Sequence, residues 1–206
     1  MHSESELRQQ PSEDGAFIQT AFKLRWRVKE GNVLLFKRHI RELKQFEFTP
    51  ALIAWLHERL EWAIANMLTP DTNAVLQLNV DPAAEIKLSL EEVEPLAAYS
   101  LDDIVYEDEH ARGLVLSEGV WPATVWLVCE DDTLVACADE LFLAVDTLAE
   151  QLAQTQGMRV VVEAQNQQTL TAAKAVFALS NEFGFIPIAG GSMPSDTLAE
   201  NFARLF

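Results

Sequence analysis

Cysteine, positive charge and long apolar runs are all scarce in this chain of 206 residues. Cys129 and Cys137 are its only cysteines, so no disulfide framework can hold the fold, and a reducing cytoplasm is the expected compartment. The two thiols flank a predicted turn, and a labile thiol pair across a hairpin stays open beside two half-buried apolar side chains. No apolar run reaches the about 18 residues that a membrane-spanning helix needs, and no basic and apolar leader is present.

Positive charge is outweighed by a factor of two. The chain has 15 lysines and arginines against 32 aspartates and glutamates, a formal net charge of −17. Binding to nucleic acid or to an anionic membrane requires basic surfaces, so neither partner is expected. The average surface also repels phosphorylated ligands unless the local charge is inverted.

Motifs that would mark common enzyme chemistries are missing as well. The sequence has no hydrolase serine elbow, no phosphate-binding glycine loop, no paired-histidine helix and no cysteine spacing for a metal. The four histidines are far apart in the sequence, so no metal site is expected. Among them only His39, which follows a basic pair at the start of a predicted helix, has a placement that invites a role.

The hydrophobic pattern predicts an α+β protein of two domains. Residues 1–15 are polar and predict a loose tail, residues 16–97 a small α+β domain, and residues 98–206 a larger α/β domain. In the first domain the predicted strands are 23–29, 33–36, 74–80 and 85–90, and the predicted helices are 37–46 and 50–67. In the second domain the predicted strands lie within 102–128 and at 133–137, 159–163, 175–179 and 184–188. Its predicted helices are 141–157, 169–174 and the segment after Ser195.

A basic stripe stands out in this acidic chain. Eight of the fifteen basic residues fall within 22 positions, namely Lys23, Arg25, Arg27, Lys29, Lys37, Arg38, Arg41 and Lys44. One interpretation is an anion-facing wall, in which Arg25 and Arg27 receive a small carboxylate ligand. The alternative is an exposed strand face that charge keeps soluble, or one paired with the protein's own carboxylates.

Four segments in order resemble a known family. They are residues 28–43, a hairpin running into a histidine-containing helix; 103–128, with the Glu118-Gly run; 141–163, a helix and strand; and 177–188, ending in Gly-x-x-Pro-Ile. This order resembles the class IV (fold-type IV) aminotransferases, which include branched-chain and D-amino acid aminotransferases and aminodeoxychorismate lyase. The resemblance implies a two-lobed D-amino acid aminotransferase-like fold, a homodimer, and pyridoxal phosphate (PLP) held by a Schiff-base lysine.

The resemblance also assigns cofactor positions. Glu118 matches the glutamate at the pyridine nitrogen, and His39 matches the helix histidine. The family's phosphate-binding arginine falls at Glu42, with Arg41 one position away, and its second phosphate hydroxyl falls at Asn181, next to Ser180. The Gly-Ile-Thr phosphate segment of the family aligns with residues 144–146, which here end in Asp146.

The catalytic lysine has no clear counterpart. In the family it lies about twenty residues before the strand that begins here at Asp103, and Lys87 is the nearest candidate, although it falls inside a predicted strand. The sequence therefore favours a shortened, degenerate relative without PLP catalysis that acts as a binding or partner protein, with no cofactor. An active PLP-dependent aminotransferase or aminodeoxychorismate lyase that acts on an amino acid-like substrate is the alternative, and an unrelated α+β binding domain is a third reading.

Overall fold

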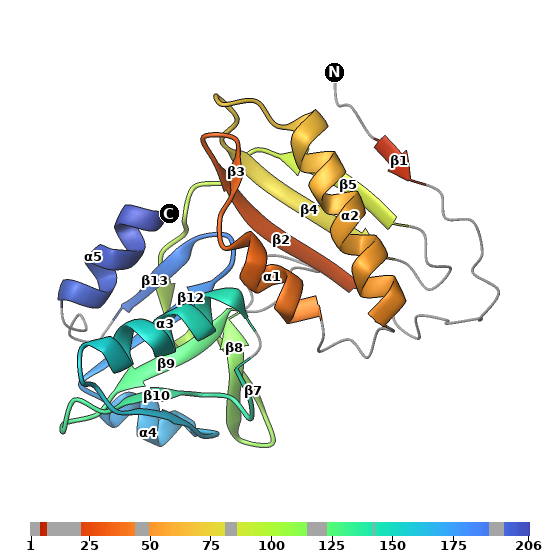
Figure 1. The fold of residues 1–206 in the computed structure, drawn as a ribbon. Helices are drawn as coiled ribbons and strands as arrows, with labels where there is room; N and C mark the ends of the chain where they lie inside the picture. Colours follow the sequence, from red (N-terminus) through yellow and green to blue (C-terminus); the bar gives the residue numbers. More distant parts are fainter. Residues whose placement is uncertain are drawn as a thin grey trace. The chain divides into compact units, whose positions relative to one another are not determined.

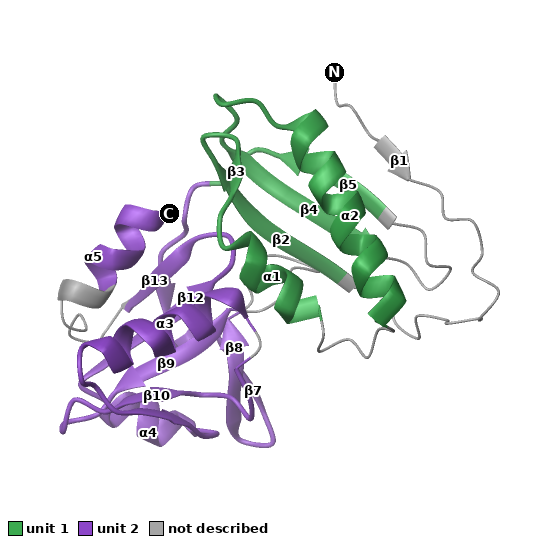
Figure 2. Cartoon of the chain, viewed as in Figure 1, with its two compact units in different colours: residues 1–94 green, residues 95–206 purple. Residues whose placement is uncertain are grey.

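The computed structural model describes residues 5–7, 22–43, 50–80, 86–114, 123–141, 143–189 and 196–206. The chain divides into two compact units, Met1–Glu94 and Pro95–Phe206 (Figure 2). The predicted boundary between residues 97 and 98 falls three positions later, in the same largely exposed connector.

Unit 1 is an antiparallel sheet with two helices. Its strands lie in the order β1 (Ser5–Leu7), β5 (Ile86–Glu91), β4 (Ala74–Val80), β2 (Phe22–Lys29) and β3 (Asn32–Val33). Helices α1 (Phe36–Glu42) and α2 (Pro50–Met67) lie along the sheet (Figure 1). The predicted alternation of β2 is confirmed, because Leu24, Trp26 and Val28 are buried while the intervening basic residues are half-buried. The predicted helix 50–67 has the observed bounds.

The hairpin that leads into α1 is shorter than predicted. The second strand, predicted over 33–36, ends at Val33, and α1 begins at Phe36. Between them Leu35 adopts a left-handed conformation with φ of 57°, which ends strand pairing and starts the helix. The end of the predicted helix 37–46 lies outside the described residues.

The N-terminal segment differs from the predicted loose tail at one place. Residues 5–7 form β1, which pairs antiparallel with Ile86 to Leu88. The edge of β5 offers unpaired backbone groups that an extended segment can bond whatever its hydropathy. The rest of residues 1–15 lies outside the described part of the chain.

Unit 2 is built on a mixed sheet. Its strand order is β11 (Val160–Val162), β10 (Leu134–Ala136), β9 (Thr124–Val128), β12 (Ala175–Ser180), β13 (Gly184–Ala189) and β6 (Tyr99–Ser100). A separate hairpin is formed by β7 (Ile104–Glu107) and β8 (His110–Leu114). The helices are α3 (Ala144–Thr155), α4 (Gln167–Ala172) and α5 (Asp196–Leu205) (Figure 1).

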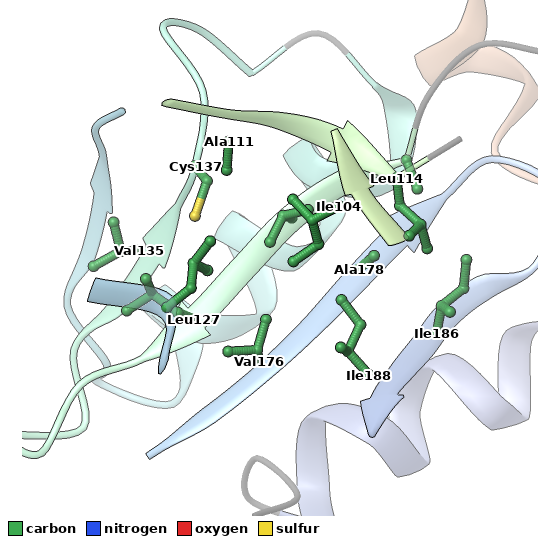
Figure 3. Packing of buried hydrophobic residues seen from close by; sticks show 13 residues of the cluster. Ile104, Ala111, Leu114, Leu127, Val135, Cys137, Val176, Ala178, Ile186 and Ile188 are labelled. Atoms are coloured by element: carbon green, nitrogen blue, oxygen red, sulfur yellow. The ribbon is translucent and has the colours of Figure 1, made fainter. Parts of the chain in front are cut away.

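Both faces of this sheet are apolar, because alternate residues of the central strands point to opposite sides. On one face Val125, Leu127 and Val176 pack with the β7–β8 hairpin, which contributes Ile104 and Leu114 (Figure 3). On the opposite face the ring of Trp126 stacks on that of Phe177, which in turn stacks on that of Phe185. The first of these rings is hydrogen-bonded by α3, so this second face is the one that α3 covers.

Several predicted details of unit 2 shift. The helix predicted from residue 141 begins at Ala144, and the one predicted over 169–174 covers Gln167–Ala172, capped by Asn166. Gly157, the predicted stop, follows the end of α3 with φ of 74°. Strand β6 lies between the predicted strand 85–90 and the predicted strands within 102–128, where the sequence predicts no strand, and a short 3-10 turn follows at Leu101–Asp103. Ser195, after which the last helix is predicted to begin, falls outside the described residues.

The cysteines do not face each other across the β9–β10 hairpin. The Cys129 N–H donates to Thr133 O, whereas the Cys137 N–H donates to Val125 O, so the backbone positions of the two cysteines are offset by four residues, roughly 13 Å, along β9. Both are free, and the open alternative of a thiol pair within the hairpin is wrong. In the described part of the chain, no helix combines the length and hydropathy needed to cross a membrane.

Candidate functional site

The first turn of α3 is tied to β9 by a buried carboxylate. Asp146, the third residue of the helix, is 1% exposed. Its Oδ1 accepts a hydrogen bond from the Trp126 indole Nε1 at 3.0 Å, and its Oδ2 accepts one from the Thr124 hydroxyl at 2.6 Å. A buried carboxylate is stable only when such partners replace its lost hydration. The Asp146 carboxylate therefore belongs to the packing of α3 on the sheet.

The residues after β12 complete this site from another part of the chain. Asn181 Oδ1 accepts a hydrogen bond from the Val145 N–H at 3.2 Å, and Ser180 Oγ accepts one from the Phe183 N–H at 2.9 Å. Ser180, Asn181 and Glu182 are all buried. The structure thus brings Ser180, Asn181 and Asp146 together at one end of α3, as the family resemblance implies.

This arrangement has a clear electrostatic consequence. A helix N-terminus binds anions through its unbonded N–H groups and its positive dipole end. Here the N–H of Val145 is bonded to Asn181, and the carboxylate of Asp146 already supplies a negative charge in the first turn. A second anion at this place would meet a like charge where water is scarce. The site stabilises the fold and disfavours a phosphate.

A second buried carboxylate lies in unit 1. Glu42, at the position of the family's phosphate arginine, is 5% exposed, and its Oε2 lies 3.0 Å from Nδ1 of His39. The His39 ring stacks on Trp26 at a centroid distance of 4.6 Å and an interplanar angle of 9°. His39 is itself 1% exposed, so it connects helix α1 to the sheet.

The other predicted site residues of unit 1 fall into separate places. Arg41 is exposed on α1, one position from the buried Glu42. Lys87 is exposed in β5, where it lies opposite Asn79 of β4. Arg25 donates to Gln77 Oε1 at 3.1 Å and forms an ion pair with Glu91. One terminal nitrogen of Arg27, NH1, is buried and has no hydrogen-bond partner among the described residues. Glu118 lies outside the described part of the chain.

Sequence reasoning missed the partners of Asp146. Trp126 and Thr124 lie two residues apart on β9 and therefore point to the same side of the sheet. The available signal was an aspartate spaced three and seven residues before Ala149 and Ala153, on the buried side of α3, since such a residue must find donors when the helix packs on a sheet. Nothing in the sequence identifies these donors, because they precede Asp146 by 22 and 20 residues.

Comparison with solved structures identifies the architecture. The chain is similar to a putative branched-chain amino acid aminotransferase from Thermotoga maritima, with a TM-score of 0.66 and 12% identity over 91% of this chain and 86% of the other. It is also similar to 4-amino-4-deoxychorismate lyase from Pseudomonas aeruginosa, with a TM-score of 0.65 and 15% identity over 98% and 97% of the two chains. This chain has the fold of the class IV aminotransferases. The fold predicted from the sequence is confirmed.

A third similar structure, an aminotransferase from Brucella abortus bound to PLP, has a TM-score of 0.65 and 13% identity over 96% of this chain and 94% of the other. No family model matches the sequence. No curated protein matches it either. The likeness to the class IV structures therefore concerns the fold, and the predicted shortening of the chain stays a prediction.

The described residues of this class IV fold do not fit PLP in the manner of the family. The first turn of α3 carries the buried Asp146 where the family resemblance puts a phosphate-binding segment. Helix α1 carries the buried Glu42 where the resemblance puts the family's arginine. The one lysine in the sequence of unit 2, Lys174, is exposed and ion-paired with Asp132. It precedes β12, six positions and roughly 20 Å from Ser180 at the strand's other end.

Proposed function

We propose that this chain is a class IV aminotransferase-like protein that acts by binding a ligand or partner, as a homodimer, without PLP catalysis. The observation that carries the proposal is the buried Asp146 in the first turn of α3. Its two hydrogen bonds to β9 make the carboxylate part of the fold. A charge held there opposes the phosphate of PLP at the place where the family resemblance puts it.

The pairing of Glu42 with His39 supports the same proposal. An arginine at this position would offer a forked donor to a phosphate, whereas Glu42 offers an acceptor and uses it on the adjacent histidine. By the family resemblance, two positions that bind the phosphate carry carboxylates here, Glu42 and Asp146. Glu42 is bonded to a side chain of unit 1, and Asp146 is bonded to side chains of unit 2. Each supports loss of the cofactor independently.

The experiment is a direct test of PLP attachment. The purified full-length chain is incubated with excess PLP, its visible absorbance is recorded, and borohydride is added before intact-mass and peptide analysis. The expected result is the spectrum of free PLP alone and no modified lysine beyond that of a chemically unfolded sample. A specific, stoichiometric adduct on one lysine of the folded protein would overturn the proposal.

An active PLP-dependent aminotransferase or aminodeoxychorismate lyase is the second candidate. It is favoured by the similarity of the fold to 4-amino-4-deoxychorismate lyase and to a PLP-bound aminotransferase. Lys87 is its candidate lysine, and the adduct experiment with Lys87→Gln tests it. Loss of a stoichiometric adduct in this variant, with retention in Lys174→Gln, would support the enzyme.

A further inference from the structure

One face of the unit 1 sheet has a charge opposite to that of the whole chain. Alternate residues of β2, β4 and β5 share this face, because Lys23, Arg25 and Arg27 lie opposite Asn79, Gln77 and Val75, which in turn lie opposite Lys87, Ser89 and Glu91. Lys29 continues the same row of β2. Across β2, β4 and β5 this face carries five cations and one carboxylate, and Glu6 of β1 adds a second carboxylate, which gives a balance of +3. The chain as a whole carries −17.

Two carboxylates lie on this face, Glu91 of β5 and Glu6 of β1, and Glu6 lies opposite Lys87. Glu91 forms its ion pair with Arg25, whose side chain is 10% exposed and also donates to Gln77. Arg27 is the next residue of β2 on the same face, and its Nη1 nitrogen has no hydrogen-bond partner among the described residues. Its NH1 nitrogen is buried, and a buried donor without an acceptor destabilises a folded protein unless a ligand or water accepts from it.

We propose that Arg27 binds the carboxylate of a small organic anion on this face of the sheet. This proposal rests on the proposed binding function and names the class of ligand. A guanidinium group offers two parallel N–H donors, which match the two oxygens of a carboxylate. The surrounding cations attract an anion electrostatically, while Arg25, held by Glu91, serves as a fixed neighbour.

Isothermal titration with sodium acetate, disodium succinate and sodium phosphate tests the proposal, with ionic strength held constant by sodium chloride. The wild-type protein is expected to bind acetate and succinate. Arg27→Gln should weaken this binding by about tenfold or more, because it removes the fork and its charge. Lys87→Gln removes one charge from the same face without changing Arg27, and its effect should be less than about twofold, as for an exposed charge.

A gain-of-binding variant keeps the test decisive if Arg27→Gln folds poorly. Glu91→Gln removes the competing carboxylate, so it should strengthen acetate binding by about threefold or more. Equal losses in Arg27→Gln and Lys87→Gln would show a response to charge alone and overturn the proposal. Failure of Glu91→Gln to strengthen binding, binding of phosphate alone, or no heat from either carboxylate with the wild-type protein would also overturn it.

The two proposals fail separately. A stoichiometric PLP adduct would contradict the proposed function and leave the titration of Arg27 unaffected. Absence of carboxylate binding would contradict the Arg27 site and leave the PLP experiment unaffected.

Discussion

Asp146 and Trp126, twenty residues apart in the sequence, are joined by a hydrogen bond of 3.0 Å from the indole Nε1 to the carboxylate Oδ1. Both residues are at most 1% exposed. This bond, with the one from Thr124, connects the first turn of α3 to the central region of the unit 2 sheet. It accounts for a carboxylate where the class IV resemblance places a phosphate-binding residue.

Replacing Asp146 by alanine should destabilise the fold. The variant leaves the Trp126 indole N–H and the Thr124 hydroxyl buried without their acceptor, so we expect a loss of about 3 kcal/mol in the free energy of unfolding. Asp146→Asn keeps one acceptor oxygen and should lose less. Urea denaturation followed by tryptophan fluorescence measures both. An alanine variant as stable as the wild type would show that the two bonds do not hold α3.

The His39–Glu42 pair should have a measurable coupling energy. Because both side chains are almost fully buried at 3.0 Å, a double-mutant cycle with His39→Ala and Glu42→Ala should give a coupling of about 1–3 kcal/mol. The matched control is the pair of His57 and Glu61 on α2, which are 3.3 Å apart but exposed. Its coupling should be about 0.3–0.5 kcal/mol. Equal values from the two cycles would contradict a structural role for the buried pair.

Gly31 should be far less tolerant of alanine than Gly157. Both have left-handed backbones, with φ of 72° and 74°. A Cβ on Gly31 would lie 2.4 Å from the carbonyl oxygen of Thr69, whereas one on Gly157 would have no atom within 4 Å. We therefore expect Gly157→Ala to cost about 1 kcal/mol, from the backbone alone. Gly31→Ala should cost about 3 kcal/mol or more, because a clash with backbone is added. Thermal or urea denaturation of the two variants gives the comparison.

The two thiols should react at very different rates in the native state. Burial raises the pKa of Cys137 to about 12, so at pH 8 only about one thiol in ten thousand is the reactive thiolate. Burial also raises the pKa of Cys129, with a further contribution from Asp131, but that side chain is half-buried. A thiol reagent should therefore modify one site in the folded chain and two in denaturant. Cys129→Ser should remove the native reaction, and its persistence would contradict this assignment.

The elements that could be predicted from sequence are those fixed by local periodicity. The alternation around Trp26 on β2 and the apolar stripe of α2 depend on which residues avoid water, and this preference is visible residue by residue. The predicted end of β3 was wrong because Leu35 adopts a left-handed conformation, which a leucine in the sequence does not indicate. Strand β6 was missed because a strand of two residues has no periodicity to read, and its partner β13 lies far along the chain.

The candidate site was predictable in its positions and not in its contacts. Asp146 and Asn181 could be named from the class IV resemblance, but their hydrogen bonds join segments 20 to 36 residues apart. Such bonds depend on tertiary packing, which a local pattern does not encode. The same limit applies to Arg25 and Arg27. They look equivalent in sequence, but the structure shows an ion pair between Arg25 and Glu91 of β5 that distinguishes Arg25 from Arg27.

The bonds of Asp146 also limit how this sequence can change over generations. A substitution that removed the carboxylate from the start of α3 would at once leave Trp126 and Thr124 without their acceptor. It would therefore lower stability unless changes at β9 accompanied it. The residue at position 146 can therefore change only together with residues 124 and 126, so these three positions are expected to vary as one group.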